Sequence, residues 1–188
     1  MQNLKIVEPM ISIYDLEALP DDGDIYEIFD GELTVSKAPA LNHQELITNF
    51  SIILGSHLWQ NPVGQIWVTP GVIFDEYNSA IPDLVFIAKE RIPQIASGIH
   101  IVGAPDLAIE IMSPGSENVR RDQIVKRQTY ARFGVKEYWV VEPIVEVIDI
   151  SRLQENVLAS VGVFRNADEI SSPLLPDLKF AVKDVFRK

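Results

Sequence analysis

The sequence predicts an α/β (α+β) fold in which helices flank a mixed central β-sheet. Two long segments have apolar residues at helical spacing, and several short segments rich in Val, Ile and Leu are typical of strands. Helix-length crossovers between the strand segments are too few for a doubly wound parallel sheet. The length of 188 residues favours a single domain over residues 1–188.

The first predicted elements are a short helix and a β-hairpin. Ser12 is expected to cap a short helix over residues 14–19. Residues 25–29 and 32–35 are largely apolar runs separated by Asp30-Gly31. Asp-Gly between two such runs is the strongest short-range signal for a hairpin, so we expect an N-terminal β-hairpin here.

The first long helix is predicted over residues 43–59, with Asn42 as its cap and Glu45 at the capping-box position. This reading favours a capping role for Glu45 over metal binding. His43 and His57 project onto the apolar arc, where a hydrogen-bonded core histidine is favoured over a metal ligand. The apolar residues of this arc are Leu46, Ile47, Phe50, Ile53, Leu54 and Leu58.

The rest of the chain predicts strands and a second long helix. The helix covers residues 116–133 and ends at Gly134, where a left-handed conformation costs little. A turn is expected at Pro143. The predicted strands are residues 65–74, 82–88, 106–112, 135–141 and 145–150, with weaker signals at 161–165 and 178–182.

The composition excludes several classes of function. The net charge is −11, so any binding of a polyanion must be local. Residues 120–136 carry a charge of +5, which either a DNA-binding track or a solvated helix face would explain. The absence of Cys excludes disulfides and thiolate metal sites and favours the cytoplasm. No run is apolar enough to predict a membrane helix.

The motifs of several common enzymes are absent from the chain. It contains no P-loop, no Gly-x-Gly-x-x-Gly fingerprint, no Gly-x-Ser-x-Gly elbow and no His-Glu-x-x-His motif. P-loop nucleotide hydrolysis, Rossmann redox chemistry and zinc proteolysis are therefore disfavoured.

Two predicted strands each carry a carboxylate in an apolar setting. Glu110 lies mid-strand between two isoleucines, and Asp83 begins the earlier strand. A period of two sends Ala108, Glu110 and Met112 to one face of the strand. An isolated buried carboxylate costs several kcal/mol, so Glu110 needs a cation, a proton or a metal as partner.

The second predicted helix supplies a third ionisable group. At 100° per residue, Asp122 and Lys126 fall on the apolar arc that should meet the sheet. An ordinary surface pair at i, i+4 is the alternative, but the inward projection favours a functional cluster. Asp, Glu and Lys together suit hydrolysis of a phosphodiester with a divalent metal, which activates water and neutralises phosphate charge.

At these residues the sequence resembles the PD-(D/E)XK nuclease superfamily, and more closely its Uma-type family of restriction-endonuclease-like proteins. The resemblance covers about residues 10–185, and the ordered set of segments is more specific than any one of them. The matching positions are residues 26–33, 82–85, 103–114, Asp122, Lys126, Tyr130 and residues 134–141.

The resemblance implies a restriction-endonuclease-like core with Asp83 and Glu110 as metal ligands for Mg²⁺ or Mn²⁺. It also implies hydrolysis of DNA phosphodiester bonds. In the superfamily's usual pattern a Lys lies two residues after the second acid, where this chain has Met112. Lys126 is expected to fill that space from the neighbouring helix, which completes a catalytic set of Asp83, Glu110 and Lys126.

Some alternatives stay open at the level of sequence. Asp106 is interpreted as a strand-start residue, while Glu27 is equally well an accessory acid or a solvent-facing strand residue. A catalytically inactive binding or regulatory module, and a hydrolase of RNA or nucleotides, are the alternatives to a DNA endonuclease. A homodimer is expected because cutting both strands requires two sites.

Overall fold

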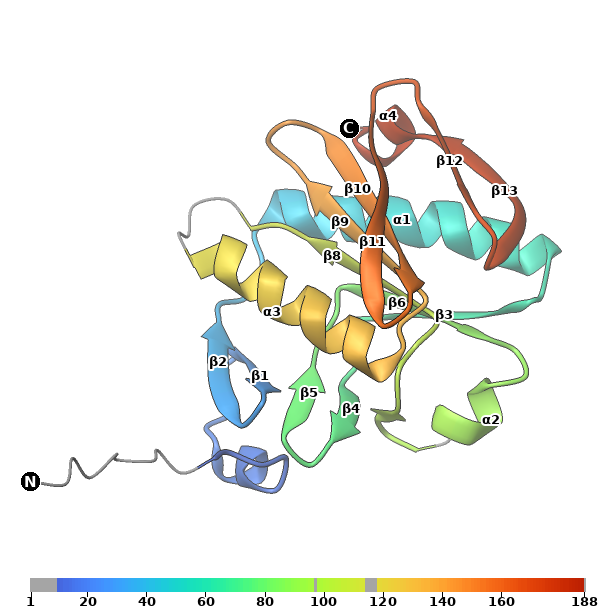
Figure 1. Ribbon diagram of the computed structural model, residues 1–188. Helices are drawn as coiled ribbons and strands as arrows, with labels where there is room; N and C mark the ends of the chain where they lie inside the picture. The colour runs from blue at the N-terminus through green and yellow to red at the C-terminus, as the bar shows by residue number, and fades with distance from the viewer. Residues whose placement is uncertain (1–9, 97, 114–117, 188) are drawn as a thin grey trace, which may run out of the picture.

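The computed structural model describes residues 10–96, 98–113 and 118–187, and of these the side chains of residues 17 and 118–123 are outside the description. A six-stranded mixed sheet forms the centre of the fold, with the long helix α1 (Leu41–Gln60) and the long helix α3 (Asn118–Phe133) packed beside it (Figure 1). This arrangement confirms the predicted α+β class.

The central sheet has the strand order β11-β10-β9-β8-β6-β3. Only the neighbours β8 and β9 run parallel, and α3 forms the crossover between them. The expectation of a mixed sheet is therefore confirmed. The strands are β3 (Gly64–Val68), β6 (Leu84–Ala88), β8 (Leu107–Ile111), β9 (Glu137–Glu142), β10 (Val147–Gln154) and β11 (Val157–Arg165).

A second sheet of five strands, in the order β2-β1-β5-β4-β7, lies below α3 in the view of Figure 1. The predicted hairpin is confirmed, since β1 and β2 pair antiparallel with Ile28 opposite Leu33. A separate two-stranded sheet is formed by β12 and β13. The strands are β1 (Ile25–Phe29), β2 (Glu32–Ser36), β4 (Val72–Asp75), β5 (Asn78–Ala80), β7 (Ile101–Val102), β12 (Glu169–Ser172) and β13 (Leu175–Ala181).

Three short helices complete the described chain. They are the 3₁₀ helix η1 (Asp15–Ala18), α2 (Ile92–Ile95) and α4 (Val182–Val185). None of the helices in the described ranges is long and apolar enough to span a bilayer.

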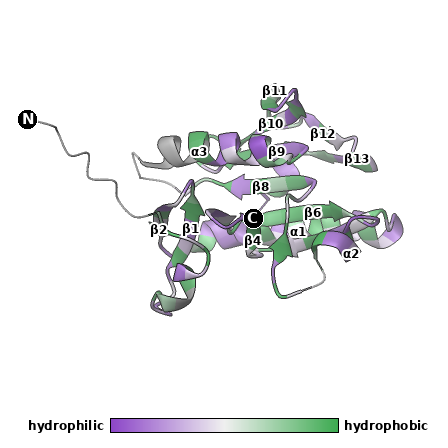
Figure 2. Ribbon diagram, turned by 60° about the horizontal axis from the view of Figure 1, so that its bottom comes forward, coloured by the Kyte–Doolittle hydropathy of each residue, from purple (hydrophilic) through white to green (hydrophobic). Residues whose placement is uncertain are grey.

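The two faces of β8 pack against different elements. Leu107, Ile109 and Ile111 belong to a buried core that includes the inner face of α1. Ala108 belongs to a second core that includes Tyr130 of α3. The predicted alternation therefore holds, and it puts Glu110 on the α3 side of the sheet (Figure 2, where β8 lies between α3 and α1).

The prediction of one strand over residues 65–74 was wrong. The segment forms β3 in the central sheet and β4 in the second sheet. Between them Thr69 has a φ of 46°, and Pro70 follows it. A left-handed residue and a proline turn the chain out of one sheet and into the other.

The predicted start of the first long helix was also wrong. Asn42 lies inside α1, and the N-cap is Ala40, which makes no side-chain cap. The carbonyl of Ala40 already accepts the N–H groups of His43 and Gln44, so the helix begins before the polar residue. The predicted short helix is present as the 3₁₀ helix η1, but its N-cap is Tyr14, and the Ser12 hydroxyl instead donates to the Asp15 carboxylate.

Gly134 ends α3 as predicted. Its φ is +90°, and the N–H groups of Gly134 and Val135 both donate to the carbonyl of Tyr130. This turn directs the chain into β9, beside β8.

We expect Gly134→Ala to lower the free energy of unfolding by about 1 kcal/mol, because an L side chain is strained at positive φ even in open space. Gly55→Ala, inside α1, should instead raise it by about 0.5 to 1 kcal/mol, since Ala has the higher helix propensity. Urea unfolding of both variants checks the pair. Equal effects of the same sign would contradict the left-handed turn.

Candidate active site

Asp83 and Glu110 come together at one end of neighbouring strands. In the antiparallel pairing of β6 and β8, Leu84 lies opposite Ile109, so the register extended by one residue puts Asp83 opposite Glu110. Directly opposed residues have Cβ atoms about 4.5 to 5.5 Å apart. Both side chains line a cavity of about 130 Å³.

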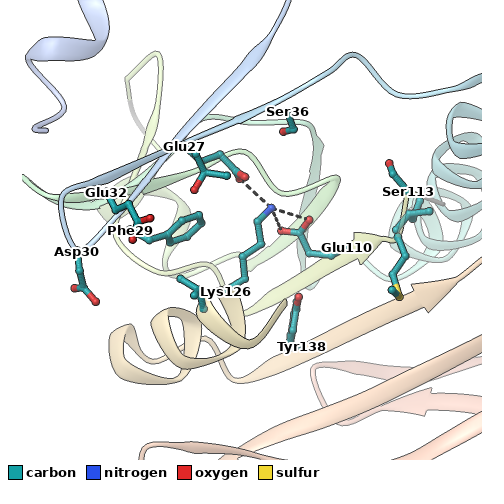
Figure 3. A pocket seen from close by; sticks show the side chains of 13 residues that line it. Glu27, Phe29, Asp30, Glu32, Ser36, Glu110, Ser113, Lys126 and Tyr138 are labelled. Atoms are coloured by element: carbon teal, nitrogen blue, oxygen red, sulfur yellow. Dashed lines mark hydrogen bonds and ion pairs between the residues drawn. The ribbon is translucent and has the colours of Figure 1, made fainter. Parts of the chain in front are cut away.

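Lys126 reaches this cavity from the inner face of α3. Its Nζ lies 3.1 Å from both carboxylate oxygens of Glu110 and 2.9 Å from Oε1 of Glu27 (Figure 3). The side chain is only 14% exposed. The ammonium therefore lies between the buried carboxylate of Glu27 and the largely buried carboxylate of Glu110. Asp122, the other inward residue of the predicted cluster, has a side chain outside the described part of the structure.

Glu27 is a buried member of the site. It is 3% exposed, so the interpretation as a solvent-facing strand residue was wrong. Its Oε1 also accepts the backbone N–H of Ile81 at 2.8 Å. A sequence signal was present, because Glu27 interrupts an apolar strand just as Glu110 does.

Asp83 is held by two donors. Its Oδ2 accepts the N–H of Ile111 at 2.7 Å and lies 3.2 Å from Nε2 of His43 on α1. His43 Nε2 also lies 3.0 Å from the carbonyl oxygen of Ile111. The expectation that His43 is a hydrogen-bonded core residue is confirmed, although its contact with Asp83 was not foreseen. Oδ1 of Asp83 has no partner within the described ranges.

Tyr130 fixes the second acid. Its hydroxyl donates to Oε1 of Glu110 at 2.6 Å, and the Tyr130 ring is fully buried. From the sequence, Tyr130 was named among the positions of the family resemblance but without a partner, because periodicity identifies the buried face of a helix and not the partner of a hydroxyl.

Burial and crowding of carboxylates dominate the electrostatics. Burial raises the pKa of Glu110 to about 7; the Lys126 ammonium opposes this shift, and the charges of Asp83 and Glu27 add to it. Burial disfavours the ammonium form of Lys126, but the two glutamates outweigh it and raise its pKa. Burial likewise disfavours the charged form of His43, and the hydrogen bond and charge of Asp83 outweigh it, so the pKa of His43 is raised.

A larger cavity of about 250 Å³ adjoins the ion pairs on the hairpin side. Asp30 and Glu32 of the hairpin line it (Figure 3). Met112, the residue that occupies the usual lysine position, also lines it. Lys126 is its only basic lining residue in the described chain.

The described basic residues near the C-terminal half of α3 are paired with acids of the protein itself. Arg132 lies 2.7 Å from Asp30, and Arg127 contacts Asp149. These contacts favour the interpretation of the basic segment as a paired helix face over that of a DNA-binding track. The side chains of Arg120 and Arg121 lie outside the described residues.

Asp106 lies at the opposite end of β8 from Glu110. It is fully buried, and its carboxylate accepts the N–H of Ala88 and pairs with Arg91 and Lys136. These partners give it a structural role at the start of the strand, as its sequence position indicates.

Within the described ranges, no three His, Asp or Glu side chains form a cluster that could hold a metal ion by themselves. Any cation here would be bound by one or two carboxylates and by water, which is the usual manner of Mg²⁺.

Comparison with known proteins gives the chain its family. The family model Uma2, described as "Putative restriction endonuclease", matches residues 13–183. The chain belongs to the Uma2 family. This membership confirms the resemblance found in the sequence, and no curated protein matches the chain.

A solved structure has the same fold as this Uma2 chain. It is described as a "putative nuclease belonging to DUF820" from Anabaena variabilis ATCC 29413, with a TM-score of 0.76 and 20% sequence identity. The match covers 94% of this chain and 97% of the other. The restriction-endonuclease-like fold is thereby established.

We expect Glu110→Gln to change how stability depends on pH. The pKa of Glu110 is about 7 in the folded protein against 4.5 ordinarily, so the stability that its protonation contributes is complete below pH 4.5 and is lost as the pH rises through 7. Relative to Glu110→Gln, the wild type should lose about 2 to 3 kcal/mol between pH 5 and pH 8.

Urea unfolding at the two pH values measures this difference. Glu45→Gln, on the exposed face of α1, is the matched control and should track the wild type at both. A constant difference between Glu110→Gln and wild type would contradict the raised pKa.

Proposed function

We propose that this chain is a metal-dependent endonuclease that hydrolyses DNA phosphodiester bonds, with Asp83, Glu110 and Lys126 as its catalytic residues. The observation that carries the proposal is the position of the Lys126 ammonium, 3.1 Å from the Glu110 carboxylate and in the same cavity as Asp83. Lys126 thus brings a positive charge to the acids from a helix, where Met112 cannot supply one from the strand.

The residues present fit a divalent cation at Asp83 and Glu110. Three carboxylates, those of Glu27, Asp83 and Glu110, line the smaller cavity, and the charges of Asp83 and Glu27 add to the rise in the pKa of Glu110 that burial causes. Oδ1 of Asp83 has no partner among the described residues. A bound Mg²⁺ or Mn²⁺ would relieve the repulsion and, when bound, would supply an activated water and neutralise charge on the phosphate.

The protein residues would orient these groups. The Ile111 N–H and His43 hold Asp83, and the Tyr130 hydroxyl holds Glu110. Lys126 keeps its proton because its pKa is raised, so it would act as a fixed positive charge and not as a general base. A fixed ammonium stabilises the negative charge that develops on the phosphate during attack.

A catalytically inactive binding or regulatory module is the second candidate. The lining of the larger cavity favours it, because Lys126 is the only basic lining residue in the described chain and is already paired with Glu27 and Glu110. A hydrolase of RNA or of nucleotides would use the same residues, so its distinction from a DNA endonuclease depends on the choice of substrate.

We also propose three features that go with a DNA endonuclease. Residues 1–188 would form a single domain, two copies would associate to cut both strands, and the protein would act in the cytoplasm, as the absence of Cys favours.

We expect purified protein to nick supercoiled plasmid DNA in the presence of Mg²⁺ or Mn²⁺ and not in EDTA. Asp83→Asn, Glu110→Gln and Lys126→Met should each lower the rate at least about 100-fold, because each removes a charge that contacts the reacting groups. Gel electrophoresis of time courses measures the rate, and single-stranded DNA, RNA and nucleotides are assayed in parallel.

Two control variants each remove a charge at a surface position outside the proposed site. Glu45→Gln and Lys89→Met, both at exposed positions, should leave the rate within twofold of wild type. Circular dichroism verifies that every variant is folded. Nicking that persists in both Asp83→Asn and Glu110→Gln would reject this site, and no cleavage of any phosphoester by the wild type would favour the inactive module.

A further inference from the structure

Glu27 contacts more parts of the site than its place on a hairpin suggests. A single oxygen, Oε1, accepts the Ile81 N–H at 2.8 Å and lies 2.9 Å from Nζ of Lys126. Ile81 precedes Asp83 by two residues, and Lys126 contacts Glu110. One buried carboxylate therefore links the segment that carries Asp83 to the ammonium on Glu110.

Lys126 needs such a partner because of its own flexibility. A lysine has a four-carbon stem with rotatable bonds, and its side chain here extends from α3 across to the sheet. With Glu110 as its only partner, the ammonium would be attracted onto the Glu110 oxygens. The proposed function requires these oxygens to bind a divalent cation. Glu27 pulls the ammonium from the hairpin side, and Figure 3 shows Nζ between the two carboxylates.

We propose that Glu27 is the positioning residue that holds the Lys126 ammonium in the active site, and that it is not itself a metal ligand. The proposal rests on the proposed function. The N–H of Ile81 belongs to the backbone and has no rotatable side chain, so its hydrogen bond fixes the Glu27 carboxylate in place. Oε1 serves both Ile81 and Lys126, so this oxygen of Glu27 is committed to these two donors.

A double-mutant cycle in urea unfolding tests the contact without any use of activity. Glu27→Gln, Lys126→Met and the double variant should show a coupling of at least tenfold in the unfolding equilibrium constant. The matched control is the exposed pair Glu169 and Lys179, whose Oε1 and Nζ atoms are 3.0 Å apart. Its cycle, with Glu169→Gln and Lys179→Met, should give less than threefold, as surface pairs do.

Steady-state nicking kinetics test the positioning role. Glu27→Gln should lower kcat at least tenfold while the KM for DNA and the Mn²⁺ concentration for half-maximal rate stay within twofold of wild type. Glu27→Asp keeps the charge and should recover part of kcat. All rates are measured well below the unfolding midpoint of each variant, so a loss of stability alone leaves kcat unchanged.

The two measurements separate the possible failures. A coupling as weak as that of the surface pair overturns the contact between Glu27 and Lys126, whatever the activity. An unchanged kcat, or a Mn²⁺ requirement raised tenfold, overturns the positioning role, and the latter result would make Glu27 a metal ligand. If the cycle shows strong coupling but the wild type cleaves no phosphoester, the ion pair stands, and the proposed function is rejected together with the positioning role of Glu27.

Discussion

The site depends on one constraint: three carboxylates share a poorly solvated space with one ammonium. Removing charge from water costs several kcal/mol per ion, and this cost is recovered only where partners are close and well oriented. Lys126 provides the cationic partner, at 2.9 Å from Glu27 and 3.1 Å from Glu110. Burial raises the pKa of Glu110, and the charges of Asp83 and Glu27 add to this rise while the Lys126 ammonium opposes it. A site with such an excess of negative charge is well matched to a divalent cation.

The fold serves this constraint by burying both faces of β8. The core under α1 packs against Leu107, Ile109 and Ile111, while the opposite face receives α3 and the hairpin. Because β8 and β9 are parallel, their connection must cross the sheet, and α3 is that crossover. The helix that completes the topology therefore also carries Lys126 and Tyr130 to Glu110. The helix α3 is therefore required both by the sheet topology and by the candidate active site.

Much of the fold could be predicted from local patterns, and the failures have physical causes. The hairpin at Asp30-Gly31 and the end of α3 at Gly134 are set by backbone preferences within a few residues, and both were found. The break between β3 and β4 was missed because apolar residues continue across Thr69 and Pro70, although the chain changes sheet there. Very short elements such as β7 and α2 give no periodic signal. Pairing with β4 stabilises β7, and α2 packs Ile92 and Ile95 against a buried core.

The sequence by itself determined which residues face the interior, because burial repeats every two residues in a strand and every 3.6 in a helix. That sufficed to select Glu110 and Lys126, the strand pattern added Asp83 at the start of the earlier strand, and the family resemblance implied that Asp83 and Glu110 are metal ligands. Only the tertiary structure decided which of these side chains contact one another. The contacts of Glu27 with Lys126, of Tyr130 with Glu110 and of His43 with Asp83 join segments far apart in the chain. Such pairings follow from sheet order and register. These depend on the packing of the whole domain, so no single residue in the sequence indicates them.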